Sequence, residues 1–315
     1  MSTIKPIVEE RSVFHILASH FSGPVTELRG TEGGLIAQTF IFRTDEKDYV
    51  IRFNADNMDA NFEKERYIAA KYNSSDVPIP EVIDIGRLHK LHYCITPRIV
   101  GEHLDRLSPE DISLALPSVI NTLNAIHDTD IGQPQGYGLF DGQGQGFFSD
   151  WSSNLTYVKD EERSDGFYGK WHNLFKTSFL DRQLFDRVYG QMEGLLICCP
   201  NKKYLVHGGY GFGNLLINKG QVSAVLDWID SKYGDPLYDV AWLDYWDAGR
   251  GYRDIFRADY KHRAVDMSGF DERLLCYQCY IALDSMRFFA KSDDHGGYRW
   301  TTDRIEGLIG NRRVQ

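Results

Sequence analysis

The sequence predicts an α+β protein with two lobes. The first is small, with an antiparallel five-stranded sheet and one helix, and the second is larger and mainly helical. Three observations support this. β-rich runs recur between residues 25 and 101, helical patterns dominate the rest of the chain, and 315 residues suggest about two domains of ~150 residues each. We therefore place the boundary between the lobes at residues 100 and 101.

In the first lobe, an amphipathic stretch that stops at Gly23-Pro24 predicts a helix over residues 1–20. The β-rich runs VTELRG, QTFIFRT and YVIRFN are separated by short turns and predict an antiparallel meander. The next run, FEKERYIAAKY, has apolar side chains at positions 62, 67, 68 and 72 and predicts the helix that follows the third strand. VPIPEVIDIG and LHYCITPRIVG add the fourth and fifth strands.

The second lobe begins with helical patterns. SPEDISLALPSVINTLNAIH starts at Ser108 with a strong helix N-terminal signature. Residues 134–149 contain five of the 29 glycines without a usable period, so we expect a long loop there. Helices are expected across residues 170–197. The short β-like runs YLVHGG, NLLINKG and VSAVLDW then precede a final helical stretch that is rich in aromatic residues.

The composition is that of a soluble globular protein, and 45 acidic against 35 basic side chains give a net charge of −10. An acidic protein gains little from binding a polyanion, so nucleic acid is excluded and a cationic small molecule is favoured. Charged Glu9, Glu10 and Arg11 interrupt any apolar leader, which predicts a cytoplasmic protein without membrane contact. We also expect a monomer. The five cysteines, including the Cys276 and Cys279 CxxC, are expected to be reduced.

Residues 205–243 hold four motifs at fixed spacing. They are His207-Gly208-Gly209, Asn214, Asp227-Trp228 and Gly234-Asp235-Pro236. This block resembles the catalytic block of the aminoglycoside phosphotransferases, which share a protein-kinase-like fold, and VPIPEVIDIG, YCITPR and the glycine-rich loop are most similar to the hygromycin B branch. The resemblance implies a nucleotide-binding lobe over 1–100 that ends in the hinge, and a catalytic and substrate-binding lobe over 101–315. It also implies transfer of phosphate from ATP or GTP to a hydroxyl of an aminoglycoside antibiotic, which would confer resistance.

Asn214 and Asp227 are the predicted Mg²⁺ ligands, because phosphoryl transfer needs a hard cation held by oxygen atoms. They lie 13 residues apart (227 − 214) and bracket the hairpin LLINKGQVSAVL, whose turn brings both ends together. A structural cap at the strand end is the alternative for Asp227. Asp235 is expected to be an N-cap with Pro236 as the first helical residue. The resemblance further suggests that Asp239 braces the catalytic turn through backbone amides.

Gly209 stands where the family has its catalytic Asp. That Asp accepts the proton of the attacking hydroxyl and orients it, and glycine can do neither. A general base typically contributes 10² to 10⁴ in rate, or roughly 3 to 5 kcal/mol. Metal and nucleotide binding need not suffer. We therefore expect a phosphotransferase scaffold whose turnover is impaired or absent, and no motif makes Asp230 a substitute base.

Arg52 in YVIRFN is the expected cation for the α- and β-phosphates, in place of the more usual Lys. Its expected partner is Glu65, with Glu63 as second choice, and a solvated ion pair is the alternative. Gly33 and Gly34 lie between the first two strands, where backbone amides could approach phosphates.

The resemblance places adenine beside the strand that links the lobes. There the Pro97 carbonyl would accept a hydrogen bond from the adenine amino group, and the Ile99 N–H would donate to the ring.

Three acids are candidates for binding the ammonium groups of the antibiotic, and ordinary surface charge explains each of them equally well. They are Asp150, Asp230 and Asp284. Two further readings of the chain stay open. One is a kinase of another small amine or alcohol, such as choline or a sugar. The other is a catalytically silent protein that binds the drug or the nucleotide, which Gly209 favours.

Overall fold

The computed structural model describes residues 5–31, 36–55, 62–164 and 166–310. The chain divides into two compact units. The first comprises residues 2–118 and 212–229, and the second comprises residues 119–211 and 230–315. The boundary that the sequence predicts between the two lobes stays a prediction.

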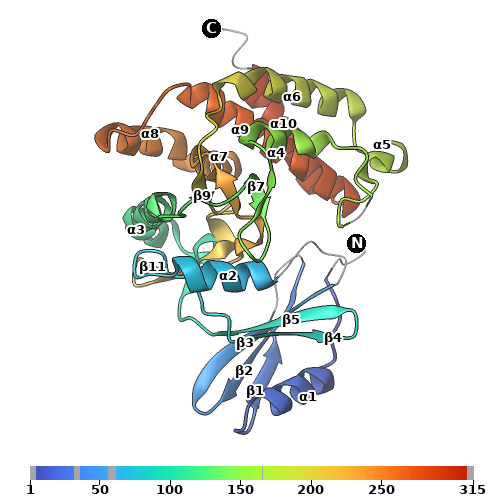
Figure 1. Ribbon diagram of the computed structural model, residues 1–315, viewed down its shortest axis with the longest axis vertical. Coiled ribbons are helices and arrows are strands. Elements are labelled where there is room, and N and C mark those ends of the chain that lie inside the picture. Colours follow the sequence, from blue (N-terminus) through green and yellow to red (C-terminus); the bar gives the residue numbers. More distant parts are fainter. Residues whose placement is uncertain (1–4, 32–35, 56–61, 165, 311–315) are drawn as a thin grey trace. The chain divides into compact units, whose positions relative to one another are not determined.

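The first unit contains the predicted five-stranded antiparallel sheet, with strand order β1-β2-β3-β5-β4 (Figure 1). Its strands are β1 (Thr26–Gly30), β2 (Gln38–Thr44), β3 (Lys47–Ala55), β4 (Asp84–Leu88) and β5 (Leu91–Pro97). The order follows from short antiparallel hairpins, β1 with β2, β2 with β3 and β4 with β5, and from the pairing of β3 with β5. The predicted fold class of this lobe is confirmed.

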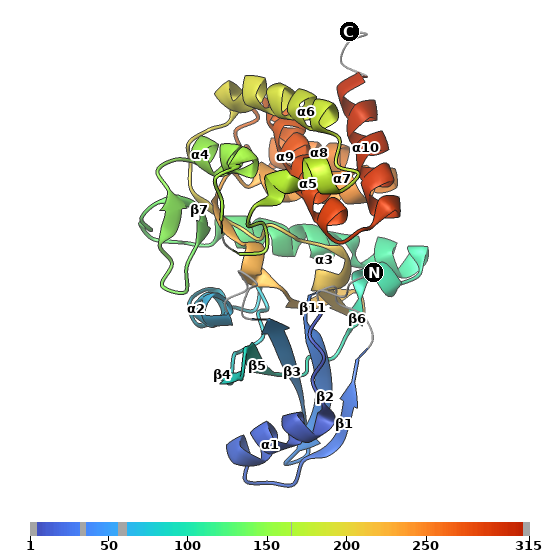
Figure 2. The same ribbon diagram turned by 90° about the vertical axis from the view of Figure 1, so that its right-hand side faces the viewer.

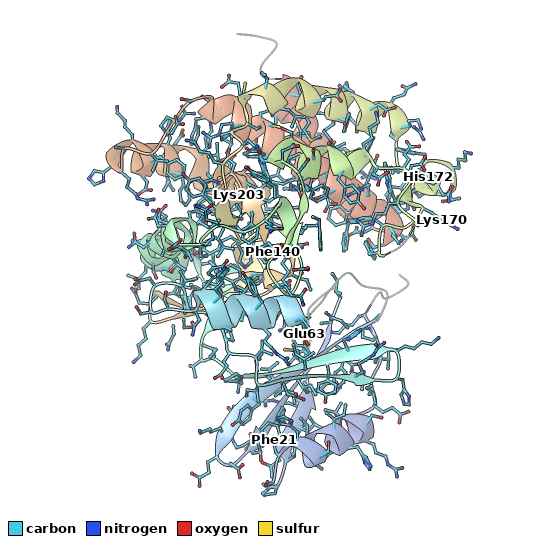
Figure 3. All side chains as sticks on the ribbon, in the orientation of Figure 1. Phe21, Glu63, Phe140, Lys170, His172 and Lys203 are labelled. Atoms are coloured by element: carbon cyan, nitrogen blue, oxygen red, sulfur yellow. The ribbon has the colours of Figure 1, made fainter. Side chains whose placement is uncertain are left out.

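Helix α1 (Glu10–His20) covers one face of this sheet. Its Val13 and Leu17 are fully buried in a cluster with sheet residues such as Ile51. The ring of Phe21, labelled in Figure 3, lies 5.5 Å from that of Phe42, centroid to centroid, and extends the same core. The helix begins at Glu10, later than the sequence predicts. Because side chains alternate along a strand, the neighbours of Ile51 point to the opposite face.

The predicted hairpin of the catalytic block also belongs to the first unit. Strands β10 (Leu215–Asn218) and β11 (Gln221–Val225) pair antiparallel, and β6 (Glu102–His103) joins β10 on its other side. The turn between β10 and β11 contains Lys219 and Gly220 with φ of 51° and 74°. This left-handed geometry suits a tight hairpin turn. The expected hairpin is therefore confirmed.

Most of the described helices belong to the second unit, as predicted (Figure 2). They are α3 (Pro109–Asp128, which starts in the first unit), α4 (Trp151–Thr156), α5 (Leu174–Thr177), α6 (Arg182–Leu195), α7 (Leu237–Trp246), α8 (Tyr252–His262), α9 (Phe270–Lys291) and α10 (His295–Gly310). Helix α9 packs against α6, α7 and α10, so it is buried along most of its length. In the described part of the chain, no helix has the length and apolar character needed to cross a membrane.

The loop predicted over residues 134–149 is wrong in part, because it contains two strands. They are β7 (Tyr137–Phe140) and β8 (Gly146–Phe148), in a sheet of order β8-β7-β12-β9 with β9 (Tyr204–Val206) and β12 (Lys232–Gly234). The ring of Phe140, labelled in Figure 3, stacks on that of Tyr233 with centroids 4.2 Å apart. Strand β7 is stabilised by a partner distant in sequence, which local patterns in a glycine-rich segment do not reveal.

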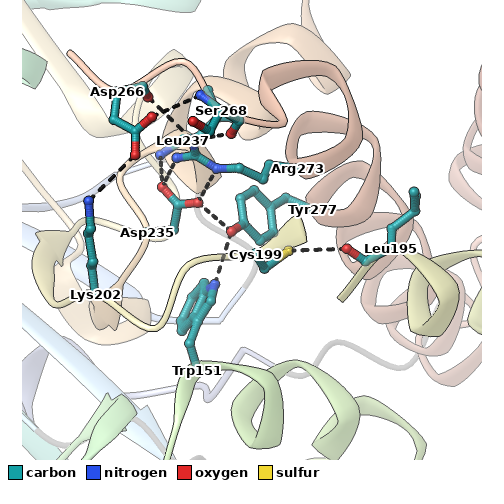
Figure 4. A network of polar contacts seen from close by, with 10 residues as sticks. All are labelled: Trp151, Leu195, Cys199, Lys202, Asp235, Leu237, Asp266, Ser268, Arg273 and Tyr277. Atoms are coloured by element: carbon teal, nitrogen blue, oxygen red, sulfur yellow. Dashed lines mark hydrogen bonds and ion pairs between the residues drawn. The ribbon is translucent and has the colours of Figure 1, made fainter. Parts of the chain in front are cut away.

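A buried ion pair holds the start of α7 (Figure 4). The fully buried carboxylate of Asp235 accepts hydrogen bonds from Arg273 Nε at 2.7 Å and Nη2 at 2.6 Å, and from the Tyr277 hydroxyl at 2.5 Å. The sequence places the N-cap at Asp235, whereas the helix begins one residue later than that implies, at Leu237. Because Pro236 has no N–H, the Asp235 carboxylate accepts instead from the Leu237 N–H at 3.1 Å.

Replacing Arg273 by Ala should lower the free energy of unfolding by about 3 to 5 kcal/mol, because it leaves the Asp235 charge buried without its ion-pair partner. The matched control is Arg187→Ala. Arg187 pairs with Glu306 at the surface, where each side chain is 49% exposed, so a change within about 1 kcal/mol is expected. Urea unfolding followed by circular dichroism measures both. Equal losses in the two variants would contradict the structural role assigned to this pair.

Candidate active site

The His207-Gly208-Gly209 turn follows β9 in the second unit and is held by Asp239 of α7. The Asp239 carboxylate accepts from the backbone N–H of His207 at 2.9 Å and of Gly208 at 2.8 Å. It also accepts from Nε2 of His127 at 3.0 Å. The Gly209 N–H donates to His207 Nδ1 at 3.2 Å. The expectation that Asp239 braces this turn through backbone amides is confirmed.

The hydrogen-bond donors around Asp239 stabilise its negative charge. Burial alone would raise the pKa of this carboxyl, but the hydrogen bond and charge of His127, helped by the Gly208 amide, outweigh burial and hold the pKa below its ordinary value. Asp239 is fully buried. The turn is therefore anchored by an ionised carboxylate that is not itself exposed to a substrate.

Gly208 is a position where only glycine fits. Its φ is +87°, and a Cβ built there would lie 2.2 Å from the carbonyl oxygen of Asp230. The next residue, Gly209, lacks the side-chain oxygen that the family pattern carries. The turn held by Asp239 therefore carries glycine at the position where the family's base is expected.

Lys232 of β12 is a feature of this region that sequence reasoning missed. It is 4% exposed, and its Nζ donates to the Asp230 carbonyl at 2.7 Å. The same Nζ lies 4.9 Å from the centroid of the Tyr238 ring and 2.9 Å from the point where a Gly208 Cβ would be. Burial lowers the pKa of Lys232, although Asp230 and other nearby acids oppose it. Strand β12 lies between β7 and β9, and no local sequence signal reveals that this buries Lys232.

In the first unit, the β10–β11 hairpin brings Asn214 and Asp227 together at its open end. Leu215 pairs with Val225, and the Leu226 N–H donates to the Asn214 carbonyl at 2.8 Å. Asp227 is exposed and has a left-handed backbone with φ of 59°. An amide and a carboxylate at this end provide the oxygen atoms that Mg²⁺ prefers. The residues present therefore fit a magnesium ion.

Arg52 of β3 and Glu65 of the helix that follows it form the expected ion pair in the first unit. Arg52 Nη1 donates to Glu65 Oε1 at 3.2 Å, and a second, shorter bond joins Nη2 to Oε2. Their side chains are 22% and 10% exposed, so the pair is not the solvated alternative. Burial would lower the pKa of Arg52, but Glu65 and, more weakly, Asp227 raise it. Asp227, the expected metal ligand, therefore acts electrostatically on Arg52, the expected phosphate-binding cation, within the first unit.

Helix α2 (Phe62–Tyr72) supplies Glu65 to this ion pair and not Glu63. Glu63, labelled in Figure 3, forms an exposed ion pair with Arg66 at 3.3 Å. Sequence reasoning also missed Lys64 on the same helix. It is 4% exposed, and its Nζ donates to the Ile229 carbonyl at 2.7 Å, two residues beyond Asp227. Helix α2 thus contacts both the strand cation and the end of the hairpin segment.

Of the remaining nucleotide-binding candidates, the structure describes Pro97 and Ile99 but not Gly33 and Gly34. Pro97 ends β5 opposite Tyr49, and the Arg98 N–H that follows donates to the Asp48 carbonyl at 3.0 Å, so Ile99 comes directly after the sheet edge. Gly33 and Gly34 lie outside the described residues.

Asp150 caps helix α4, unlike the other two substrate candidates. Its carboxylate accepts from the Ser153 N–H at 2.8 Å and from the hydroxyls of Ser149 and Ser153, each at 2.8 Å. The backbone hydrogen bond from Ser153 is the main reason that the pKa of Asp150 is lowered. A structural role therefore accounts for this residue whether or not it binds a substrate.

Asp230 and Asp284 lie in one aromatic neighbourhood of the second unit. The pKa of the buried hydroxyls of Tyr168 and Tyr280 is raised by burial first, and in each case both acids raise it further. Asp284 also pairs with Arg287 Nη2 at 2.6 Å, while 39% of its side chain stays exposed. Asp230 and Asp284 thus both influence the same two tyrosines of the second unit.

The antiparallel sheet with its Arg52–Glu65 pair, together with the turn held by Asp239, defines a protein-kinase-like phosphotransferase fold. The chain belongs to the phosphotransferase enzyme family (APH), which it matches over residues 27–274. It is similar to a curated protein, hygromycin-B 4-O-kinase of Escherichia coli, with 27% identity over 309 residues that cover 97% of this chain and 86% of that protein.

Solved structures agree with this placement. A thermostable mutant of aminoglycoside phosphotransferase APH(4)-Ia, in ternary complex with AMP-PNP and hygromycin B, has a TM-score of 0.84 and 26% identity and covers 96% of this chain and 100% of that chain. Another such mutant, in complex with ADP and hygromycin B, has a TM-score of 0.81 and 27% identity over 95% and 98% of the two chains. Spectinomycin phosphotransferase APH(9)-Ia, at 13% identity and a TM-score of 0.59, shares the fold alone.

Proposed function

We propose that this chain is a nucleotide-dependent phosphotransferase for a hydroxyl of an aminoglycoside of the hygromycin B type, with turnover limited by Gly209. The observation that carries the proposal is that Asp239 holds the turn of the catalytic block although position 209, where the family's base is expected, is glycine. Asn214 and Asp227 close one end of their hairpin. Similar proteins bind AMP-PNP or ADP together with hygromycin B, which supports both ligands.

In this proposal, each residue has one task in binding. Arg52 donates to the α- and β-phosphates of ATP or GTP while Glu65 fixes its guanidinium, and the fork geometry suits phosphate oxygens. The Pro97 carbonyl and the Ile99 N–H bind the adenine edge. The amides of Gly33 and Gly34 are the remaining candidates for contact with phosphate.

Asn214 and Asp227 hold Mg²⁺, which when bound neutralises charge on the phosphates. Asp230 and Asp284 bind ammonium groups of the drug, and Asp150 is the third candidate for that task. Without a carboxylate at position 209, that residue neither orients the attacking hydroxyl nor takes its proton, so the reaction relies on the bound ligands being held close together and on stabilisation of charge. This same departure favours a second candidate function, a silent protein that binds the drug or the nucleotide.

Binding of hygromycin B should weaken as ionic strength rises. Between about 0.1 M and about 1 M salt the screening length falls from ~10 Å to ~3 Å, so attraction between exposed carboxylates and drug ammonium groups is screened. Calorimetric titration measures this without turnover. Asp230→Asn and Asp284→Asn should each reduce the affinity. Asp150→Asn tests the third acid cleanly, because Asn keeps a good N-cap and removes only the charge.

Two outcomes would redirect the proposal. If hygromycin B and other aminoglycosides fail to bind while choline or a neutral sugar binds at micromolar affinity, the chain is a kinase of another small molecule. If the drug and the nucleotide both bind but no phosphate is transferred, even after a carboxylate is restored at position 209, the silent binding protein is the better description.

A further inference from the structure

Two cysteines that are distant in the sequence lie side by side in the second unit. Cys199 follows the end of α6, and its Sγ lies 3.8 Å from the Leu195 carbonyl oxygen. Cys276 lies in α9, and its Sγ lies 3.6 Å from the carbonyl oxygen of Met192. Met192 and Leu195 are three residues apart and so share one face of α6. Both thiols therefore point at the same helical turn, and each is the main influence on the pKa of the other.

The two thiols differ in a way that suits sequential chemistry. Cys199 is partly exposed, whereas Cys276 is fully buried. The influence of Cys276 lowers the pKa of the Cys199 thiol against the effect of burial. The influence of Cys199, together with burial, raises the pKa of Cys276. Because the thiolate is the reactive form, Cys199 is the thiol that an oxidant meets first.

Cys199 lies beside the polar network of Tyr277 and Asp235 at the start of α7 (Figure 4). Tyr277 follows Cys276 directly. Its hydroxyl donates to Asp235 at 2.5 Å and accepts from Trp151 Nε1 at 3.2 Å. The Asp235 carboxylate accepts a hydrogen bond from the Leu237 N–H at the start of α7. The same helix carries Asp239, whose carboxylate binds the turn at residues 207–209. A shift of Cys276 therefore acts on the backbone that frames the catalytic position.

We propose that Cys199 and Cys276 form an oxidative modification site, at which hydrogen peroxide produces a reversible intramolecular disulfide. The Cys199 thiolate attacks one peroxide oxygen, the O–O bond breaks, and the hydroxide that leaves takes up a proton. The resulting sulfenic acid is then attacked by the sulfur of Cys276. The S–O bond breaks, and water leaves with the Cys276 proton. Overall, two thiols and one peroxide give one disulfide and two waters.

The disulfide also changes the local structure. An S–S bond of ~2.05 Å is much shorter than the contact between two thiols, so the end of α6 and the first turns of α9 must approach each other. The adjacent Tyr277 then moves relative to Asp235, which weakens the hydrogen bonds at the start of α7. Oxidation at this pair is thereby connected to the turn that carries position 209.

Peptide mapping of the full-length protein tests the linkage. Trypsin releases residues 188–202, with Cys198 and Cys199, and residues 274–287, with Cys276 and Cys279. After peroxide and alkylation, the two peptides should be joined, and dithiothreitol should separate them. The doubly substituted protein Cys198→Ser, Cys279→Ser should keep this linkage, while Cys199→Ser and Cys276→Ser should each lose it. Linkage that survives in Cys199→Ser, or Cys199 recovered only as sulfinic acid, would overturn the proposal.

Hydrogen exchange tests the connection to the active-site turn without any assay of activity. In the oxidised protein, the amides of residues 207–208 and of Leu237 should lose protection, and reduction should restore it. Cys94→Ser, which changes a cysteine of the first unit, should behave like the unchanged protein. A disulfide that forms while these amides keep full protection would overturn the connection to the turn.

Discussion

Gly209→Asp is expected to raise turnover at least ~10²-fold with hygromycin B and Mg²⁺-ATP, the lower figure for general-base catalysis. Asp239 already holds the turn through the His207 and Gly208 amides, so the new carboxylate enters a frame that is in place. It would accept the proton of the attacking hydroxyl and orient it. Nucleotide affinity should change little, because Arg52 and the metal ligands are untouched. Release of ADP in a coupled assay measures the rate.

The matched control for this variant is Gly209→Asn. Asn has nearly the same shape as Asp but cannot accept a proton at neutral pH, so it separates the base from the volume of the side chain. Gly209→Asn should remain close to the starting protein. Equal rates for the starting protein and Gly209→Asp would remove Gly209 from the explanation. Equal gains in the Asp and Asn variants would assign the effect to orientation of the hydroxyl alone.

Asp227→Ala should abolish the Mg²⁺-dependent part of nucleotide binding. The carboxylate is exposed at the end of the hairpin, and a hard cation that bridges phosphates requires such oxygen ligands. Asn214→Ala should have a smaller effect, because it removes a neutral ligand and leaves the charge. Titration of ATP with Mg²⁺ and then with a chelator measures the difference between the two conditions.

Asp76→Ala is the control for charge in this experiment, since Asp76 is an exposed acid of the same unit. It should leave the Mg²⁺ dependence as it is. Unchanged Mg²⁺-dependent affinity in Asp227→Ala would show that this carboxylate caps a strand end and binds no metal. The same loss in Asp76→Ala would assign the effect to the general field of an acidic protein.

Local patterns were sufficient for much of the first unit. Alternation in YVIRFN places the side chains of Arg52 and Ile51 on opposite faces of the strand. The hairpin that joins Asn214 to Asp227 follows from its short turn. Period and turn chemistry are enough here because the residues are close in sequence. The apolar spacing of α2 predicts its charges on the outer face, whereas Glu65 is buried, and its pairing with Arg52 followed from the resemblance to kinases.

Sequence by itself therefore determined the α+β fold class, the family, and the glycine at position 209. Only the tertiary structure decided that Lys232 is buried beside the turn, that Asp235 pairs with Arg273, and that Cys199 and Cys276 both point at one turn of α6. The partners in these contacts come from distant segments, and burial depends on which strand or helix packs on either side. A lysine or a cysteine in a local pattern looks the same at the surface and in the core, so its environment emerges only when the chain has folded.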